Sequence, residues 1–437
     1  MASSESDTGA RADRNGEFRQ LSLGEIEAAR SRHTWTRSAV HVTGDLVLAG
    51  RWDGTVTAFD ADSLETRWTA SHPDHAVGIA TLEDGTGTGS GTDADAIVVA
   101  GRGETGTIAA YNAETGAKQW RYDTAADVGD PVRDSVFYLP YVVAIEAGDT
   151  DAGDERLYAA ARRYERDGDV RRWYSTVLAF DADGTVRWRY ETDASPIAID
   201  LAPDGDRLAV GYNRCLGDHD HGLVVLDAAT GDPKWTWDPG TPGDRRVGDV
   251  SFDGDRLAVA SHGDKRGYLL GPGGAERWWV DLAVETEIDG ETLYAYPNHV
   301  SASDGRVAFV TGNTYAEESR ETENRHPNEH RVTVVDAAGD PVWDDAVRGF
   351  VHGLAAADGT IVAPCAQNFR VRDPGTHAIR WFDRETGTGG VEGFDGIATA
   401  AAVADGTIAA IEEPVEYHDE SETRGEYAVH VGSVDGC

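Results

Sequence analysis

The chain has 437 residues, and its 78 acidic side chains outnumber its 39 basic ones, which gives a formal net charge of −39 at pH 7. A surface this acidic repels phosphate backbones and anionic headgroups, so it argues against a nucleic-acid partner and against work on an anionic membrane. Hydrophobic residues make up 40% of the chain. This is enough to bury a large core and excludes global disorder.

The basic residues are almost all arginine, because the chain contains only Lys118, Lys234 and Lys265 as lysines. An Asp-rich, lysine-poor composition resembles that of haloarchaeal proteins. At 1 M salt the Debye length falls to about 3 Å, and the self-repulsion of such a surface is largely screened. We therefore expect a protein adapted to high salt. Its net charge is then explained by the salt concentration of its solvent more than by the charge of a binding partner.

Residues 1–30 are predicted to be a disordered or partly helical tail. The segment has no apolar core of the kind that a signal peptide needs. The longest apolar run, Val136–Ile145, is too short to span a membrane. The cysteines, Cys215, Cys365 and Cys437, are odd in number and far apart, which predicts no disulfide framework. Together these features predict a cytoplasmic protein without a membrane span.

From residue 31 onward one phrase recurs: an apolar strand, an Asp or Asn, a tight turn and then a tryptophan. Two full copies are GTIAAYNAETGAKQW at Gly106–Trp120 and GLVVLDAATGDPKW at Gly222–Trp235. Twelve Asp-Gly dipeptides mark further hairpin turns, where positive φ angles are required. The pattern predicts units of four short strands, seven of which end in a tryptophan: Trp68, Trp120, Trp188, Trp235, Trp278, Trp343 and Trp381.

An eighth unit near the C-terminus lacks its tryptophan, whereas Trp35 stands before the first strand without a hairpin of its own. The economical interpretation is that the N-terminal strand completes the last unit and closes a ring. We therefore predict an all-β fold over residues 31–437: a single eight-bladed β-propeller of four-stranded antiparallel blades, with Trp35 and the seven other tryptophans docking neighbouring blades.

This phrase resembles the pyrroloquinoline-quinone (PQQ)-like repeat, and the resemblance covers residues 33–437. The family includes quinoprotein alcohol dehydrogenases and the non-enzymatic propeller lipoprotein of the outer-membrane barrel-assembly machinery. Its dehydrogenases resemble one another in an adjacent cysteine pair and in a calcium site of Glu, Asn and Asp. This chain has no adjacent cysteines. We therefore expect no cofactor, with PQQ and Ca²⁺ as the alternative that the resemblance leaves open.

Three charged insertions precede the hairpins of their own units, at 162–174, 313–330 and 412–426. They are expected to project from one common edge of the blades as long hairpin tips. Such tips provide either a docking surface or plain solvated loops.

The loops that lead into the inner strands should ring one mouth of the central channel. Their polar residues would form a small binding surface there, unless they are ordinary solvated loop positions. The candidates are Arg37, His75, Asp130, Ser195, Arg246, Asn298, His299, His352 and Asp395.

Cys215, His219 and His221 place one thiol and two imidazoles within seven residues. They are weak metal candidates, because the spacing matches no closed structural site. No hydrolase elbow, phosphate-binding loop or His-Glu-x-x-His motif occurs, so no catalytic residue is assigned. The sequence favours a non-enzymatic propeller that acts as a protein-interaction or assembly scaffold in a high-salt cytoplasm. A quinone- or metal-dependent oxidoreductase and a small-ligand sensor, each using the channel mouth, remain open, as does the oligomeric state.

Overall fold

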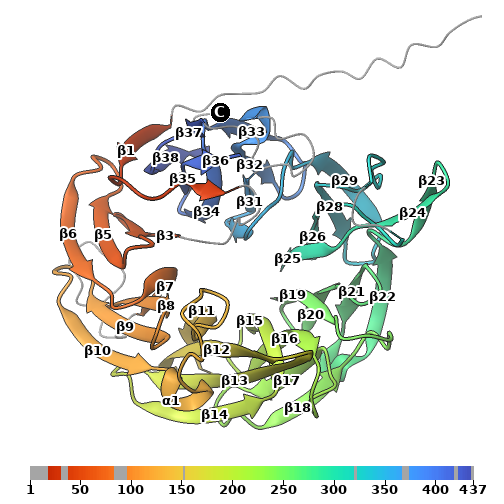
Figure 1. Cartoon of the computed structure of the whole chain (residues 1–437), viewed down its shortest axis with the longest axis horizontal. Coiled ribbons are helices and arrows are strands. Elements are labelled where there is room, and N and C mark those ends of the chain that lie inside the picture. Colours follow the sequence, from red (N-terminus) through yellow and green to blue (C-terminus); the bar gives the residue numbers. More distant parts are fainter. Residues whose placement is uncertain are drawn as a thin grey trace, which may run out of the picture.

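The structure is a computed structural model that describes residues 18–30, 38–82, 96–150, 153–318, 322–366, 374–417 and 422–434. Within these residues the chain is all-β except for the short helix α1 (Ala125–Val128) and two 3-10 turns, η1 (Pro272–Gly274) and η2 (Pro374–Thr376). The strands form four-stranded antiparallel sheets that follow one another round a central axis, as in a β-propeller (Figure 1).

In each sheet of the first half, the strands follow one another in chain order from the inner to the outer strand. The first sheet contains β3 (Ala39–Thr43), β4 (Leu46–Gly50), β5 (Thr55–Asp60) and β6 (Thr66–Ser71), and the second contains β7 (His75–Leu82), β8 (Ala96–Arg102), β9 (Thr107–Asn112) and β10 (Lys118–Asp123). The third contains β11 (Tyr141–Asp149), β12 (Glu155–Asp167), β13 (Val170–Asp181) and β14 (Val186–Thr192), and the fourth contains β15 (Ala194–Leu201), β16 (Arg207–Cys215), β17 (Leu223–Asp227) and β18 (Pro233–Trp237). A single pairing of Tyr141 with Arg102 links the second and third of these sheets.

The second half continues with β19 (Val247–Asp253), β20 (Arg256–Ser261), β21 (Arg266–Leu270) and β22 (Glu276–Asp281); β25 (Pro297–Ser303), β26 (Arg306–Thr311), β28 (Arg331–Asp336) and β29 (Pro341–Ala346); β30 (Ala355–Ala357), β31 (Thr360–Cys365), β32 (Ala378–Asp383) and β33 (Gly389–Gly393); and β34 (Ile397–Ala404), β35 (Thr407–Glu413), β38 (Ala428–Ser433) and β1 (Arg19–Ser22). Two small sheets lie outside this series: β2 (Ala29–Arg30) with β36 (Val415–Glu416) and β37 (Thr423–Arg424), and β23 (Thr286–Ile288) with β24 (Glu291–Tyr294) and β27 (Tyr315–Ala316).

The N-terminal segment differs from the expected tail. Residues 19–22 form β1, the outer strand beside β38, with Arg19 opposite Val431 and Leu21 opposite Val429. Leu21 packs against the core between the last sheet and the first, in which Leu23 is buried. Segment 18–30 is therefore extended rather than helical, because these apolar side chains and the free edge of β38 hold it. Trp35 and Arg37 lie outside the described residues.

The middle strands are buried on both faces, because each sheet packs against a neighbour on either side. All five residues of β4 and all seven of β8 are buried. The outer strands instead expose alternate residues, as in β22. The apolar core is thus a series of layers between successive sheets, not one central mass.

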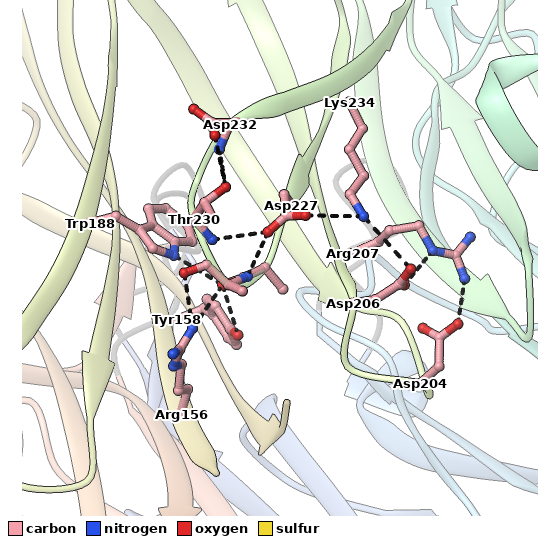
Figure 2. Close-up of polar contacts among 12 residues, drawn as sticks. Arg156, Tyr158, Trp188, Asp204, Asp206, Arg207, Asp227, Thr230, Asp232 and Lys234 are labelled. Carbon is pink, nitrogen blue, oxygen red and sulfur yellow. Dashed lines mark hydrogen bonds and ion pairs between the residues drawn. The ribbon is translucent and has the colours of Figure 1, made fainter. Parts of the chain in front are cut away.

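The repeated turn is built from its own side chains. The Asp227 Oδ1 atom accepts hydrogen bonds from the backbone amides of Ala229, at 3.1 Å, and Thr230, at 3.0 Å (Figure 2). Gly231 then adopts φ +77°, and a Cβ atom there would lie 2.6 Å from the indole of Trp188. The turn needs a glycine for both reasons.

Tryptophans of the outer strands dock onto these turns. The Trp188 indole of β14 donates to the Ala228 carbonyl of the next sheet at 2.9 Å, and the Tyr158 hydroxyl donates to the same oxygen at 3.2 Å (Figure 2). The same indole-to-carbonyl contact recurs from Trp68 to Ala113, Trp120 to Ala182, Trp278 to Ala337 and Trp343 to Arg384. Trp235 packs against Gly274 of the following turn.

Trp381 has a different place from the other tryptophans. It lies on β32, the third strand of its sheet, and is buried against the next sheet beside Ile408 and Ala410. The turn phrase of this unit follows Trp381 instead of preceding it, and Val391 of β33 stands where the docking tryptophan is expected. The predicted register of the seventh unit is therefore corrected by one strand.

Candidate functional site

One edge of the sheets collects the loops that can form a site. In each antiparallel sheet, the turn between the second and third strands lies at the same edge as the connection to the next sheet. All three charged insertions, 162–174, 313–330 and 412–426, join second and third strands. This edge is called the mouth face below.

A cavity of about 840 Å³ opens on the mouth face. Aromatic rings form much of its wall, among them Tyr141, Tyr164, Trp173, Tyr296 and Tyr315. Two of the insertions contribute to the wall, through the hairpin of β12 and β13 and through the segment between β26 and β28. The volume lies in the range of pockets that bury small ligands or a few side chains.

The charge of the cavity is opposite to that of the chain. Among the described residues, the carboxylates, imidazoles and guanidiniums on its wall come from two aspartates, three histidines and five arginines: Asp244, Asp249, His262, His299, His352, Arg102, Arg162, Arg171, Arg214 and Arg245. Asp244 accepts a hydrogen bond from Arg214, so this pair is internally neutral. A protein with a net charge of −39 thus concentrates positive charge at one concave site.

Arg102 and Arg162 lie beside one aromatic ring. Their guanidinium carbons are 4.6 Å and 5.6 Å from the centroid of Tyr141, and Arg162 also lies 5.0 Å from the ring of Trp173. Burial lowers the pKa of Arg162 to about 10, and the charge of Arg102 contributes. Arg162 therefore remains a cation at neutral pH, held by cation–π contacts.

Arg162 is oriented from the neighbouring sheet. Its Nη1 atom donates to the Ser195 hydroxyl and, at 3.0 Å, to the Pro196 carbonyl. Both acceptors belong to β15, whereas Arg162 belongs to β12. The packing of two sheets thus fixes the direction of this cation.

Arg245 and His262 form the opposite part of the wall. The guanidinium carbon of Arg245 lies 4.6 Å from the ring centroid of Tyr296, which is 4.9 Å from that of His262. Burial, with Arg245 nearby, lowers the pKa of His262 to about 3. His262 is therefore a neutral imidazole at pH 7.

The tautomer of His262 follows from its neighbour. The Asn213 Nδ2 atom donates to the Val247 carbonyl at 3.1 Å, which identifies it as the nitrogen, and lies 2.6 Å from His262 Nδ1. His262 Nδ1 is therefore an acceptor, and its Nε2 atom carries the proton. This Nε2 atom is buried and has no acceptor at ordinary hydrogen-bond geometry among the described residues, although the Asn298 side chain is close enough to raise the pKa of His262.

Part of the predicted polar ring lies at the cavity. Asn298, His299 and His352 line it, and Ser195 supports Arg162. Burial lowers the pKa of His352 to about 4, so this imidazole is neutral as well.

The other predicted mouth residues that the structure describes, His75, Arg246, Asp130 and Asp395, do not line the cavity. His75 stacks on Trp52 with 3.7 Å between ring centroids. The Arg246 Nε atom pairs with Asp238 at 2.9 Å, and its Nη1 atom donates to the Thr241 carbonyl at the same distance. Asp130 and Asp395 are exposed.

The sequence analysis missed the cavity arginines. Their alternation with aromatic residues in RRYERDGDVRRWY, from Arg162 to Tyr174, was the available signal. Every second residue at each end of this hairpin, Arg162 and Tyr164 and then Arg171 and Trp173, lines the cavity. The residues between them face away from it, and Arg163 is buried and donates to the Val128 carbonyl.

The weak metal candidates do not converge. The Cys215 thiol lies 3.4 Å from the backbone oxygen of His221, and His219 Nε2 lies 2.9 Å from that same oxygen. Burial raises the pKa of the Cys215 thiol to about 12. Among the described residues, these three side chains form no group that could hold a metal ion.

Residues 52–250 match the family model described as outer membrane protein assembly factor BamB. Over these residues the chain carries PQQ-like repeats. No curated protein sequence matches it significantly. Within the described residues, no helix is both long and apolar enough to cross a membrane.

Solved structures of other proteins share the fold of this chain. BamB from Moraxella catarrhalis is 16% identical, with a TM-score of 0.54 over 95% of this chain and 98% of that one. The quinohemoprotein alcohol dehydrogenase ADHIIG from Pseudomonas putida HK5 is 13% identical, with a TM-score of 0.59 over 97% and 77%. The computationally designed Ika8 protein is 12% identical, with a TM-score of 0.58 over 94% and 99%.

The PQQ-like repeats raise the question of whether the quinone fits. Its carboxylates would suit the cavity arginines, and its planar rings would suit the aromatic wall. A calcium ion needs several oxygen ligands. The described residues contain no group of three His, Cys, Asp or Glu side chains that could hold a metal. The donor set therefore fits the organic anion but not the metal that accompanies it in the dehydrogenases.

Proposed function

We propose that this PQQ-like-repeat protein is a non-enzymatic scaffold whose mouth face binds a protein partner. The proposal depends on one observation, the position of the exposed apolar side chains. Contiguous apolar surface on a folded protein usually marks an interaction site.

Five of the exposed large apolar residues lie on loops or hairpins of the mouth face: Val132, Phe137, Val170, Tyr174 and Leu216. Phe137 and Leu216 also line the cavity. The two others among the described residues, Trp279 and Val342, lie on outer strands. Apolar exposure is thus concentrated around the positively charged cavity, as in an interface with a central pocket.

The scaffold is proposed to be an eight-bladed ring closed by β1. Counting each run of four strands as one blade gives eight. In support, β1 pairs with β38, and the Arg19 Nη2 atom donates to the Ala61 carbonyl of the first sheet at 2.7 Å. A closed ring leaves no blade with an uncovered face, which suits a rigid docking platform.

We further propose that the protein works in a high-salt cytoplasm. The composition favours a saline solvent, as argued above. Cys215 and Cys365 are buried free thiols. Unpaired cysteines of this kind are typical of a reducing compartment.

Site-specific photo-crosslinking in the native host tests the scaffold function. A photoreactive residue at Val170 or Leu216 should yield one dominant adduct, whereas the same residue at Trp279 should not. The partner, identified by mass spectrometry and purified, must then bind the isolated protein directly. Identical adducts from all three positions, or a solitary monomer without adducts, would contradict the proposal.

A quinone-dependent oxidoreductase is the second candidate, because the cavity arginines suit an organic polycarboxylate. It is tested by titration with PQQ, with and without Ca²⁺, followed by absorbance and by dye-linked turnover. Saturable one-to-one binding with turnover would replace the scaffold proposal.

A further inference from the structure

We propose that the cavity on the mouth face receives an acidic segment of the partner, in which carboxylate side chains stand next to apolar ones. This inference rests on the proposed scaffold function and names the chemistry of the segment that it recognises. Three features carry it: cations without carboxylate partners, an unpaired hydrogen-bond donor, and the apolar rim.

Arg162, Arg171 and Arg245 line the cavity, and none of them forms an ion pair with a described carboxylate. The chain has two acidic residues for each basic one, and many arginines elsewhere are paired, for example Arg189 with Asp127 at 2.9 Å. Arg162 and Arg245 are partly buried, whereas Arg171 is exposed. A partly buried cation without a counter-ion is costly, and an incoming carboxylate offsets this cost.

His262 adds a neutral donor to the same wall. It is 93% buried, since its exposed fraction is 7%, and its protonated Nε2 atom has no acceptor at ordinary hydrogen-bond geometry among the described residues. A buried N–H without an acceptor carries a desolvation cost that a ligand oxygen removes. His262 and Arg245 both contact the Tyr296 ring, so this neutral imidazole and this cation lie on the same part of the cavity wall.

The apolar rim favours a polypeptide over a free small anion. A small anion would satisfy the arginines but would leave Val132, Val170 and Tyr174 exposed, because these residues lie on the mouth face but are not part of the cavity wall. Phe137 and Leu216 belong to both the rim and the wall. A segment that inserts acidic side chains and lays apolar ones over the rim uses both surfaces, which is a known mode of acidic-motif recognition.

Fluorescence anisotropy with the full chain tests the inference. The probe is a short fluorescein-labelled peptide in which Glu and Asp alternate with Leu and Phe. Two matched peptides carry Gln and Asn in place of the acids, or Ser in place of the apolar residues. We expect saturable binding of the first peptide and at least about tenfold weaker binding of both others, since each lacks one of the two complementary features.

Arg245→Gln is the main protein variant, and Arg187→Gln is its matched control. Arg187 is half-exposed on β14 and pairs with Asp181 at 3.2 Å, away from the cavity wall. We expect R245Q to weaken the binding of the acidic peptide by roughly thirtyfold, because the substitution removes one partner of a partly buried charge pair. We expect R187Q to leave the binding of this peptide unchanged. Arg162→Gln is a second variant, used only if its thermal unfolding midpoint equals that of the unmodified protein.

Equal binding of the acidic peptide and its amide twin would overturn the inference. So would binding of benzene-1,3,5-tricarboxylate in the cavity without any peptide binding, since the site would then serve a free small anion. If either result were obtained while the photo-crosslinks from Val170 to the partner persisted, the inference would fail but the scaffold function would stand. If neither peptide binding nor crosslinks from Val170 were observed, the scaffold function would be rejected as well.

Discussion

The Arg19 guanidinium donates to the Ala61 carbonyl at 2.7 Å, in the same position in which the Trp188 indole donates to the Ala228 carbonyl at 2.9 Å. An arginine thus replaces the docking tryptophan where the last sheet meets the first. The turn that receives it has changed accordingly. Leu64, with φ +59°, stands where Gly231 stands in the other turn, and no tryptophan of the described residues belongs to the core cluster around Leu64.

Removing the Arg19 contact should weaken the junction between the first and last sheets. We expect Arg19→Ala to lower the free energy of unfolding by about 1 kcal/mol, since it deletes a charged hydrogen bond to a backbone carbonyl. Gln20→Ala is the control, because Gln20 is an exposed residue of the same strand. The measurement is urea denaturation, and equal effects of the two variants would contradict this role of Arg19.

Gly231→Ala should destabilise the protein through two separate effects. The positive φ costs about 1 kcal/mol, and the new Cβ atom would lie 2.6 Å from the Trp188 ring, which adds a packing cost of about 1–3 kcal/mol. Gly254→Ala is the matched control, because Gly254 has φ +62° and nothing within 4 Å of its added Cβ atom. Calorimetric midpoints should fall further for G231A than for G254A. If the two falls were equal, the indole would not restrict this turn.

His262 should make the folded state lose stability in mild acid. Its pKa is lowered to about 3 when folded and is about 6.5 when unfolded, so the unfolded state binds the extra proton first. The neutral His262 therefore leaves the free energy of unfolding undiminished above pH 6.5, and this free energy falls by about 1 kcal/mol for each pH unit below that value. Protonation is further opposed by Arg214, Arg245 and His299 nearby.

The test compares the pH dependence of unfolding free energy in His262→Gln and in the unmodified protein. The variant should show a shallower slope between pH 6.5 and pH 4. His221→Gln serves as the control, since His221 is an exposed residue outside the cavity wall. A slope that is unchanged in H262Q would mean that this imidazole is not kept neutral by folding.

Salt should stabilise the protein strongly. With a net charge of −39, self-repulsion opposes the compact state, and about 2 M KCl reduces the screening length to a few ångströms. We expect the unfolding midpoint to rise steadily between about 0.2 M and about 2 M KCl. Sucrose at matched osmolality separates screening from solvent exclusion; an equal rise in sucrose would contradict the electrostatic explanation.

The repeated sheets could be predicted because their turns are local. The turn at Asp227, Thr230 and Gly231 is formed within a few residues, so the repeated sequence motif contains every residue that the turn needs. The same locality explains the error at Trp381. An indole after an apolar strand fits the phrase, but the turn that defines the unit starts only at Asp383.

The cavity could not be predicted in the same way. The direction of Arg162 depends on Ser195 and Pro196 of another sheet, and Arg245 lies over the ring of Tyr296, which directly precedes β25. No spacing along the chain records such contacts. The four residues of β1 were missed for a similar reason, because their partner strand lies some 400 positions away.

The pairing of Arg19 with Val431 also sets an order of events during biosynthesis. On the ribosome, β1 emerges long before β38 and cannot pair with it until β38 itself has left the exit tunnel. Its neighbours along the chain can fold earlier, since their strands pair with the next ones to emerge. The earliest strand of the chain is therefore the last to be seated, and a nascent chain that stalls before β38 keeps an open seam for chaperones to shield.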